Sequence, residues 1–254
     1  MKLASVDFHI HSTWSDGYSS IEGILDYCVR KGLKSVGITD HYSHNSVKCS
    51  QLTEDLSGYF EDLLSASEKY RDKIIVKKGI EIDTRACVFD SPEEMRVLTS
   101  KRFDYYLFEY VTDNFGAGAN FLPYKNNRKP LVLLNRIRDF KRLLPKECSV
   151  GLAHAYLHIL PDEELREAIE ILIDADIFVE LNSTYQNYKM DGFERIFETR
   201  EIKLSLGSDA HTLHQIGKLT QPLKYVRKYN AEDRLVFTEG VDELEIEFRK
   251  TPTI

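Results

Sequence analysis

The chain has 254 residues, of which 42% are hydrophobic, and a formal net charge of −7. This acidic balance argues against general nucleic-acid binding, which needs a surplus of Lys and Arg facing the phosphates. No apolar run approaches the roughly 18 residues of a membrane span, and the N-terminus lacks the long apolar region of a signal peptide. We therefore expect a cytoplasmic protein that does not associate with membranes.

Length and composition are consistent with one domain that covers residues 1–254. α/β barrels commonly reach this length as a single unit, and no low-complexity linker, internal repeat or charge block divides the sequence. Cys28, Cys49, Cys87 and Cys148 are dispersed without C-x-x-C spacing. Reduced thiols are therefore expected rather than disulfides.

Short apolar runs alternate with helical patterns along the chain. The first run, from Leu3 to Phe8, precedes a helix that a capping-box pair of Ser19 and Glu22 begins and Gly32 ends. Further helices are predicted over 52–64, from Ser91-Pro92 onward, over 131–144 and from Pro161 onward. The remaining strands are predicted over 35–39, 74–81, 103–111, 149–153, 177–181 and 202–206.

The strand–helix alternation predicts a parallel α/β array. Strands that are apolar throughout suit a sheet covered on both faces. Histidines and carboxylates follow most of these strands, whereas an open doubly wound sheet gathers ligands at only one or two strand ends. In barrels, the active site is built after the C-terminal ends of the strands. We therefore predict a distorted seven-stranded (β/α)7 TIM-like barrel.

Histidine–carboxylate clusters at the strand ends indicate chemistry. They are His9-Ile10-His11 with Asp16, Asp40-His41, Glu81, His154, and Asp209-Ala210-His211. Imidazole nitrogens and carboxylate oxygens together are the ligands of zinc, manganese and iron. Clusters of this kind, in phase with the strands, predict a hydrolytic metal centre.

The motifs closely resemble those of the PHP (polymerase and histidinol phosphatase) family. The resembling segments are His9-x-His11-Ser12-x-x-Ser15-Asp16-Gly17, Gly37-Ile38-Thr39-Asp40-His41, Gly79-Ile80-Glu81, Ala153-His154 and Gly207-Ser208-Asp209-Ala210-His211. The resemblance extends from residue 7 to about residue 217. It implies a distorted seven-stranded barrel, up to three divalent metals at its mouth, and hydrolysis of phosphate esters.

The resemblance assigns eight side chains to these metals: His9, His11, Glu81 and Asp209 to one, Asp16, His41 and His211 to a second, and Glu81 with His154 to a third. The expected cofactors are two to three ions of Zn, Mn or Fe, with Mg as a further option. Asp209, Glu81 and His211 are the expected catalytic residues. Asp209 could orient the attacking water or accept its proton, and Asp40 is expected to orient His41 or a neighbouring ligand.

The fourth predicted strand departs from the family pattern. The family has a histidine at the position of Val111, and a valine side chain does not ligate. Either the metal shared by Glu81 and His154 is weak or absent, or Glu109 or Asp113 supplies a replacement oxygen. An oxygen-richer site would favour manganese or magnesium over zinc.

Candidate substrate-binding residues lie in the loops. Arg85 follows Glu81 closely, and Arg128 lies in a basic segment after the fourth strand. Both are candidates to bind a phosphate. Asn182 either touches substrate or caps the sixth strand, and Trp14 either stacks on an aromatic leaving group or packs over the barrel mouth.

Three functions remain open at this point. The favoured one is a phosphoesterase that hydrolyses a small phosphorylated metabolite with metal-activated hydroxide, preferably a phosphomonoester; histidinol phosphate and phosphodiesters are alternative substrates. The second is a metal-dependent hydrolase of a non-phosphorus bond. The third is a non-catalytic, metal-stabilised scaffold, which the Val111 departure makes conceivable. No pattern in the sequence indicates an oligomeric state.

Overall fold

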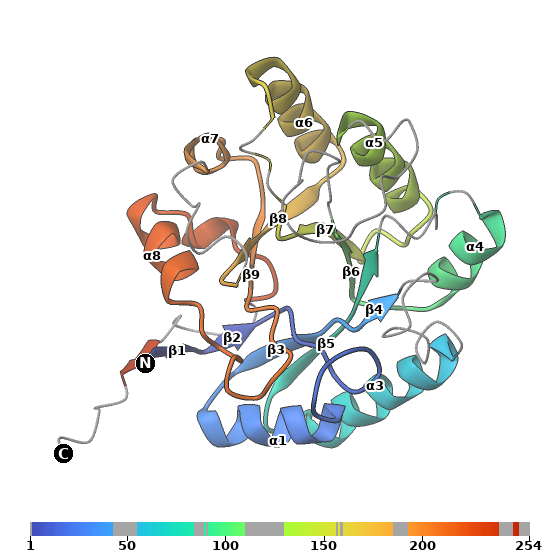
Figure 1. The fold of residues 1–254 in the computed structure, drawn as a ribbon, viewed down its shortest axis with the longest axis vertical. Coiled ribbons are helices and arrows are strands. Elements are labelled where there is room, and N and C mark those ends of the chain that lie inside the picture. Colours follow the sequence, from blue (N-terminus) through green and yellow to red (C-terminus); the bar gives the residue numbers. More distant parts are fainter. Residues whose placement is uncertain are drawn as a thin grey trace.

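Parallel strands form a nearly closed barrel in the computed structural model, which describes residues 2–42, 55–83, 89, 91–109, 130–155, 157, 160–184, 193–238 and 246–248. In order around the barrel (Figure 1), the strands are β2 (Val6–Asp7), β3 (Ser35–Ile38), β5 (Ile75–Asp83), β6 (Tyr105–Glu109), β7 (Ser149–Ala153), β8 (Ile177–Asn182) and β9 (Leu204–Gly207). The short strand β4 (His41–Tyr42) continues the line of β3 along β5. The predicted α/β barrel with seven strand positions is confirmed.

Hydrogen bonds between the first and last strands close the barrel. The Phe8 N–H donates to the Leu206 carbonyl at 2.9 Å, and the His11 N–H donates to the Ala210 carbonyl at 2.9 Å. A parallel bridge between Ile10 and Ala210 continues this pairing beyond the strands themselves. The closure places the segment that contains His9 and His11 beside the segment that contains Asp209.

Helices lie outside the strands (Figure 1). They are α1 (Ile21–Lys31), α3 (Leu56–Tyr70), α4 (Pro92–Ser100), α5 (Pro130–Lys141), α6 (Asp162–Asp174), α7 (Glu194–Glu198), α8 (Thr220–Lys228) and the 3-10 helix η6 (Glu232–Arg234). Helix α1 begins one residue later than the capping-box prediction requires. Ser20, not Ser19, is therefore its N-cap, and its side chain accepts a hydrogen bond from the Gly23 N–H at 3.2 Å. Ser91 caps α4 as predicted.

The first predicted strand is divided in the structure. Leu3 lies in β1 (Lys2–Ala4), which pairs antiparallel with β10 (Ile246–Phe248) in a separate two-stranded sheet. Only β2, after Ser5, joins the barrel. The apolar run from Leu3 to Phe8 therefore contributes residues to two sheets, because the chain bends at Ser5 between β1 and β2.

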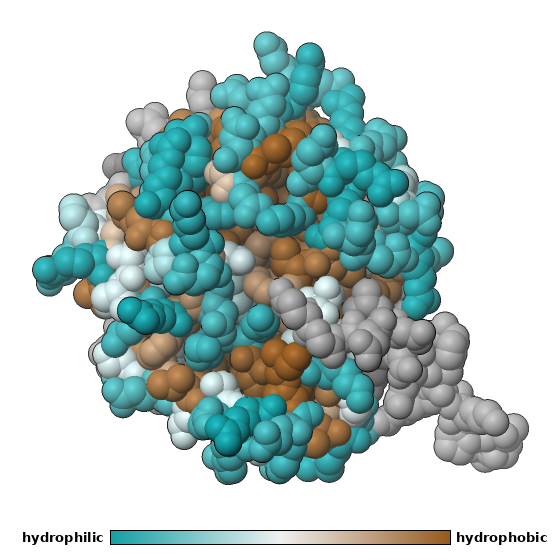
Figure 2. Space-filling model, turned by 180° about the vertical axis from the view of Figure 1, so that it is seen from behind, coloured by the Kyte–Doolittle hydropathy of each residue, from teal (hydrophilic) through white to brown (hydrophobic). Residues whose placement is uncertain are grey.

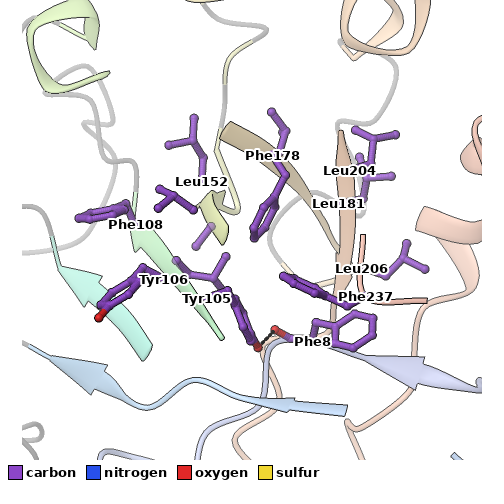
Figure 3. Close-up of a cluster of buried hydrophobic side chains, with 14 of the residues drawn as sticks. Phe8, Tyr105, Tyr106, Phe108, Leu152, Phe178, Leu181, Leu204, Leu206 and Phe237 are labelled. Carbon is purple, nitrogen blue, oxygen red and sulfur yellow. Dashed lines mark hydrogen bonds between the residues drawn. The ribbon is translucent and has the colours of Figure 1, made fainter. Parts of the chain in front are cut away.

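Aromatic side chains fill the barrel interior (Figure 3). The Phe237 ring lies 5.3 Å from Phe8, 4.8 Å from Tyr105 and 5.6 Å from Phe178, measured between ring centroids. The Tyr105 hydroxyl donates to the Phe8 carbonyl at 2.7 Å, across the barrel. A Cβ on Gly37 would lie 2.0 Å from the Tyr105 hydroxyl oxygen. Glycine in β3 therefore makes room for this side chain.

The face of the molecule seen in Figure 2 has mainly hydrophilic side chains around its edge, with apolar side chains visible between the polar ones. Helix α6 shows the reason, because it buries Leu165, Ala168 and Leu172 while its acidic first turn faces outward. No helix in the described ranges is long and apolar enough to span a bilayer. Cys28 and Cys148 are buried free thiols, as predicted, whereas Cys49 and Cys87 lie outside the described residues.

Replacing Tyr105 with Phe should lower the free energy of unfolding by about 1–3 kcal/mol, because the buried Phe8 carbonyl loses its donor. Chemical denaturation followed by circular dichroism would measure the change. Tyr18→Phe is the control, since Tyr18 is 80% exposed and its hydroxyl is in solvent. Equal stability of both variants would contradict this account of the barrel interior.

Candidate metal centre

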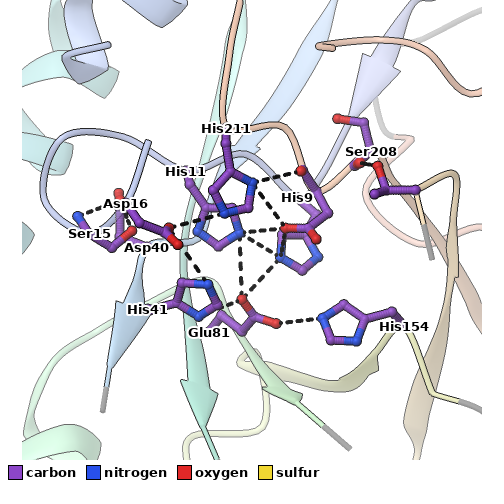
Figure 4. Close-up of polar contacts among 12 residues, drawn as sticks. His9, His11, Ser15, Asp16, Asp40, His41, Glu81, His154, Ser208 and His211 are labelled. Carbon is purple, nitrogen blue, oxygen red and sulfur yellow. Dashed lines mark hydrogen bonds and ion pairs between the residues drawn. The ribbon is translucent and has the colours of Figure 1, made fainter. Parts of the chain in front are cut away.

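The histidines that follow β2 both face the barrel mouth. Successive residues of an extended chain point in opposite directions, so His9 and His11 lie on one side while Ile10 lies on the other. Both imidazoles are buried, and their Nε2 atoms are 3.0 Å apart. Two ring nitrogens at this distance need a proton or a cation between them. Figure 4 shows the surrounding side chains.

Four buried side chains converge at this point. His9, His11, Glu81 and Asp209 each place one potential ligand atom within 4.8 Å of the others. The His9 Nε2 atom lies 3.2 Å from Glu81 Oε2, and the His11 Nε2 atom lies 2.8 Å from Asp209 Oδ1. Glu81 comes from β5, whose strand end brings its carboxylate into the mouth. These are the four side chains that the sequence grouped around one metal.

A second group adjoins the first. His11, Asp16, His41 and His211 also place ligand atoms within 4.8 Å of one another. Asp16 Oδ1 lies 3.1 Å from His211 Nε2 and 3.8 Å from His41 Nε2. The sequence assignment gave His11 to the first group alone. In the structure its ring stacks against that of His41 and against that of His211, with centroids 4.4 Å away in each case, and those two rings are 6.3 Å apart.

Glu81 lies between several histidines. Its Oε2 atom is 3.0 Å from His41 Nδ1, and its Oε1 atom is 3.1 Å from His154 Nε2. The carboxylate therefore has one oxygen directed to each side, which is the arrangement expected of a bridging ligand. His154 is not a member of either close group of ligand atoms in the described residues, so its role at a third metal stays a prediction. Val111 and Asp113 lie outside the described residues.

Glu109 ends strand β6, where its register partner on β7 is Ala153. Its negative charge contributes to the raised pKa of both His41 and His154, although less than Glu81 does. The side chain is not a member of either close group of ligand atoms in the described residues. Glu109 as a replacement ligand stays a prediction.

Charge shapes the whole cluster. Burial opposes protonation of His9, but Glu180, Glu81 and Asp209 outweigh it and hold the pKa of His9 well above its ordinary value. Burial likewise opposes ionisation of Asp16, yet His211, His41 and His11 lower the pKa of Asp16 to about 2. The pKa of Asp209 is lowered for the same reason, against its own burial.

These groups fit a divalent cation. Buried carboxylates need positive charge nearby, and among the described residues only protons on the histidines supply it within the cluster. His11 Nδ1 is buried without a hydrogen bond, and Asp16 Oδ1 is within ion-pair distance of the His211 and His41 rings. Nitrogen and carboxylate oxygen donors at this density suit zinc, manganese or iron.

The backbone at two of these positions is unusual. His154 has φ 34° and Asp209 has φ 54°, in the left-handed region that non-glycine residues rarely occupy. Such conformations persist only where surrounding contacts hold them, and they concentrate at functional sites. The sequence does not reveal these left-handed conformations, because glycine is the residue that usually marks such a position and neither residue is a glycine.

Asp40 supports the loop that contains the ligands. Its carboxylate accepts hydrogen bonds from the N–H and hydroxyl of Ser12, at 2.7 Å each, and from those of Ser15, at 3.1 and 2.6 Å. The sequence predicted that Asp40 orients His41 or a neighbouring ligand. Its contacts fix the turn between His11 and Asp16, so its effect on ligands passes through that loop.

Two further buried carboxylates were missed by the sequence reasoning. Asp7 accepts from the Ser208 N–H and hydroxyl at 3.0 and 2.6 Å and from the Gly217 N–H at 2.7 Å, which links β2 to the segment before Asp209. Burial raises the pKa of Asp7 to about 6 despite these bonds. Glu180 contacts His9 directly, at 2.7 Å. A carboxylate inside an otherwise apolar strand was the available signal for Glu180.

The proposed substrate-binding residues fare differently. Arg85 and Arg128 lie outside the described residues. Asn182 is fully buried; its amide donates to Glu180 at 3.2 Å, and its oxygen accepts from the Thr184 N–H at 2.8 Å. These contacts favour the strand-capping alternative. Trp14 donates to Asp62 at 2.8 Å and so belongs to the packing around the mouth.

A comparison with known families decides the classification. The model of the PHP domain matches residues 7–184, which is more than half of the chain. The chain belongs to the PHP domain family. The matched segment begins just before His9 and includes His9-Ile10-His11, Asp40-His41, Glu81 and His154. Asp209 and His211 lie beyond it.

One curated protein resembles part of this chain. The DNA polymerase/3′-5′ exonuclease PolX of Bacillus subtilis (strain 168) is 34% identical over 77 residues, which are 30% of this chain and 13% of that protein. The match thus spans only a small part of the curated relative's length.

Among solved structures, the histidinol phosphate phosphatase of Lactococcus lactis, complexed with zinc, L-histidinol and phosphate, superposes with a TM-score of 0.59. It is 17% identical, and the alignment covers 88% of this chain and 93% of that one. A second solved structure is described with the metal-dependent tyrosine phosphatases YwqE of Bacillus subtilis and CpsB of Streptococcus pneumoniae, and it superposes with a TM-score of 0.51. It is 16% identical, and the alignment covers 90% of this chain and 88% of that one. At these identities the likeness concerns the fold.

Gly207→Ala should disturb the centre. A Cβ there would lie 1.9 Å from Glu180 Oε1 and 2.6 Å from His9 Cβ, so Glu180 or His9 must move. We expect a loss of about 1–3 kcal/mol of stability from overpacking, together with weaker metal binding, measured by denaturation and chelator competition. Gly23→Ala in α1 is the matched control and should keep both properties. Wild-type behaviour of Gly207→Ala would contradict the described packing.

Metal binding should release protons and strengthen with rising pH. Despite burial, contact with Glu81 raises the pKa of His154 to about 8, and His9 also has a raised pKa. A cation must displace these protons, which are bound below the raised pKa, so affinity should increase as pH rises through about 8. Calorimetric titration with Zn²⁺ or Mn²⁺ in buffers of different ionisation enthalpy would count the protons. Affinity independent of pH would contradict the protonation described for these histidines.

Proposed function

We propose that this protein is a metal-dependent phosphoesterase that hydrolyses a small phosphorylated metabolite, with a phosphomonoester as the favoured substrate. The observation that carries the proposal is the pair of adjoining ligand groups that share His11. Glu81 belongs to the first group, contacts His41 of the second through its Oε2 atom, and contacts His154 through its Oε1 atom. Adjacent cation positions of this kind suit the transfer of a phosphoryl group. Membership of the PHP domain family supports the same reading.

The proposed ligands are His9, His11, Glu81 and Asp209 for one cation, and Asp16, His41 and His211, adjoined by His11, for a second. His154 with Glu81 offers a position for a third. Bound there, the cations would neutralise phosphoryl oxygens and lower the pKa of an attacking water. Zinc, manganese or iron fits the mixed nitrogen and oxygen donors.

We assign the other roles in catalysis to side chains of the protein. Asp209 is nearly fully buried beside His9 and His11, and its lowered pKa keeps it ionised. We assign it to orient the attacking water and accept its proton. Glu81 holds the histidines of both groups in place. His211 is the most exposed of these ligands, at 26% of its side chain, so it lies on the solvent side where a substrate would enter.

Phosphate charge favours a phosphomonoester over a neutral substrate. A terminal phosphate dianion matches a site with at least two cations and, in our proposal, Arg85 and Arg128 nearby. Histidinol phosphate is one candidate among small phosphorylated metabolites. Phosphodiesters, non-phosphorus substrates and a non-catalytic metal-stabilised role are the alternatives that the experiment must separate.

Wild-type protein reconstituted with Mn²⁺, Zn²⁺ or Mg²⁺ should release phosphate from a panel of phosphomonoesters. Asp209→Asn should keep the fold and lose most of this activity, on the order of a hundredfold or more, because it loses a proton acceptor and weakens a ligand together. Asp104→Asn is the matched control: Asp104 pairs with Lys78, away from the proposed ligands. His41→Ala should lower metal content, whereas His214→Ala, on an exposed side chain, should not.

The same panel should include phosphodiesters, among them short DNA, and amides. Turnover of diesters alone would contradict the proposed phosphomonoester substrate and identify a phosphodiesterase. Turnover of amides alone would contradict the proposed phosphoesterase and identify a hydrolase of a non-phosphorus bond. Metal binding with no turnover of any substrate would favour the scaffold. Failure of the wild type to bind metal would refute the proposed centre.

A further inference from the structure

Glu180 is a buried carboxylate in the centre of the barrel. It lies on β8, only 1% of the residue is exposed, and its neighbours along the strand, Val179 and Leu181, are fully buried apolar residues. Placing a carboxylate there costs free energy unless its oxygens are paired. Each of its two oxygens has a close polar partner, and the two principal partners are proposed metal ligands on other strands.

The first oxygen determines the form of His9. Glu180 Oε1 lies 2.7 Å from His9 Nδ1. A carboxylate oxygen accepts, so the proton is on Nδ1 and Nε2 is left free to ligate. That Nε2 atom lies 3.2 Å from Glu81 Oε2 and 3.4 Å from Asp209 Oδ1. The contact thus directs the free nitrogen of His9 at the point where the ligands converge.

The second oxygen holds the backbone at His154. Glu180 Oε2 accepts the His154 N–H at 2.7 Å. This is the residue whose φ of 34° is costly for a side chain with a Cβ. In that conformation His154 Nε2 reaches Glu81 Oε1 at 3.1 Å. The hydrogen bond therefore stabilises the turn that directs His154 to the bridging carboxylate.

The surroundings leave Glu180 little freedom. Gly207 on β9 has no Cβ, and one would lie 1.9 Å from Glu180 Oε1. The Asn182 amide, two residues along the same strand, donates to Oε2 at 3.2 Å. These contacts fix the carboxylate, and each of its oxygens meets a different proposed ligand residue.

We propose that Glu180 is a positioning residue of the metal centre, which fixes the Nδ1–H tautomer of His9 and the backbone of His154 with one carboxylate. The inference rests on the proposed function, because it assumes that His9 and His154 ligate. Glu180→Gln tests it at almost constant shape. Glutamine has one oxygen and one amide group. If its NH2 faces His154, two donors meet; if it faces His9, the His9 proton must move to Nε2 and block the ligand atom.

Wild type, Glu180→Gln and the control Asp104→Asn should be compared for zinc affinity by competition with a chromophoric chelator. We expect Glu180→Gln to bind zinc about 10–100-fold more weakly, the usual effect of removing such a partner, while Asp104→Asn binds as the wild type does. Circular dichroism should show the same fold in all three. Equal affinity of wild type and Glu180→Gln would overturn the positioning role and leave the metal centre intact. Wild-type protein that binds none of zinc, manganese and iron would overturn both proposals.

A second measurement does not depend on the folding of Glu180→Gln. In zinc-loaded wild type labelled with ¹⁵N-histidine, long-range ¹H–¹⁵N correlation spectra identify which ring nitrogen is protonated. His9, assigned by comparison with His9→Gln, should show a protonated Nδ1 and a zinc-bound Nε2. Zinc on Nδ1, or a bare Nδ1, would overturn the proposal even if Glu180→Gln fails to fold.

Discussion

The burial of Glu81 is the constraint on which the rest of this site depends. Its carboxylate has no exposed surface, and it lies near the C-terminal end of β5 in a parallel barrel. A buried carboxylate of this kind must be balanced by positive charge and hydrogen bonds. His9, His41 and His154 approach its two oxygens within about 3 Å. Three histidines of the barrel mouth are therefore arranged around this one carboxylate.

A layer of support lies behind these groups. Asp40 fixes the turn between His11 and Asp16, Asp7 joins the first and last strands, and Glu180 contacts both His9 and the backbone of His154. Each of these carboxylates pairs with donors of the chain itself. Ligands that are held by such partners keep their orientation in a site of mixed charge.

The apolar interior and the polar mouth share the same strands. Tyr105 and Phe237 fill the barrel below the site, and the Tyr105 hydroxyl bonds to the backbone of Phe8, next to His9. Glycines such as Gly37 and Gly207 admit these large or charged side chains where a Cβ would collide. Close packing between the strands therefore fixes where the ligand side chains lie.

The sequence by itself determined the strand and helix alternation, the barrel class and the candidate ligands. Its evidence was local, because apolar runs and caps such as Ser91 depend on neighbouring residues, and His9-Ile10-His11 or Asp209-Ala210-His211 carries its chemistry within a short segment. The tertiary structure decided what depends on contacts between distant segments. Barrel closure placed His11 in two ligand groups, and packing set the left-handed backbone of His154 and Asp209. The partnership of Glu180 with His9 joins residues 171 positions apart, and nothing in an apolar strand pattern predicts which distant nitrogen a buried carboxylate will meet.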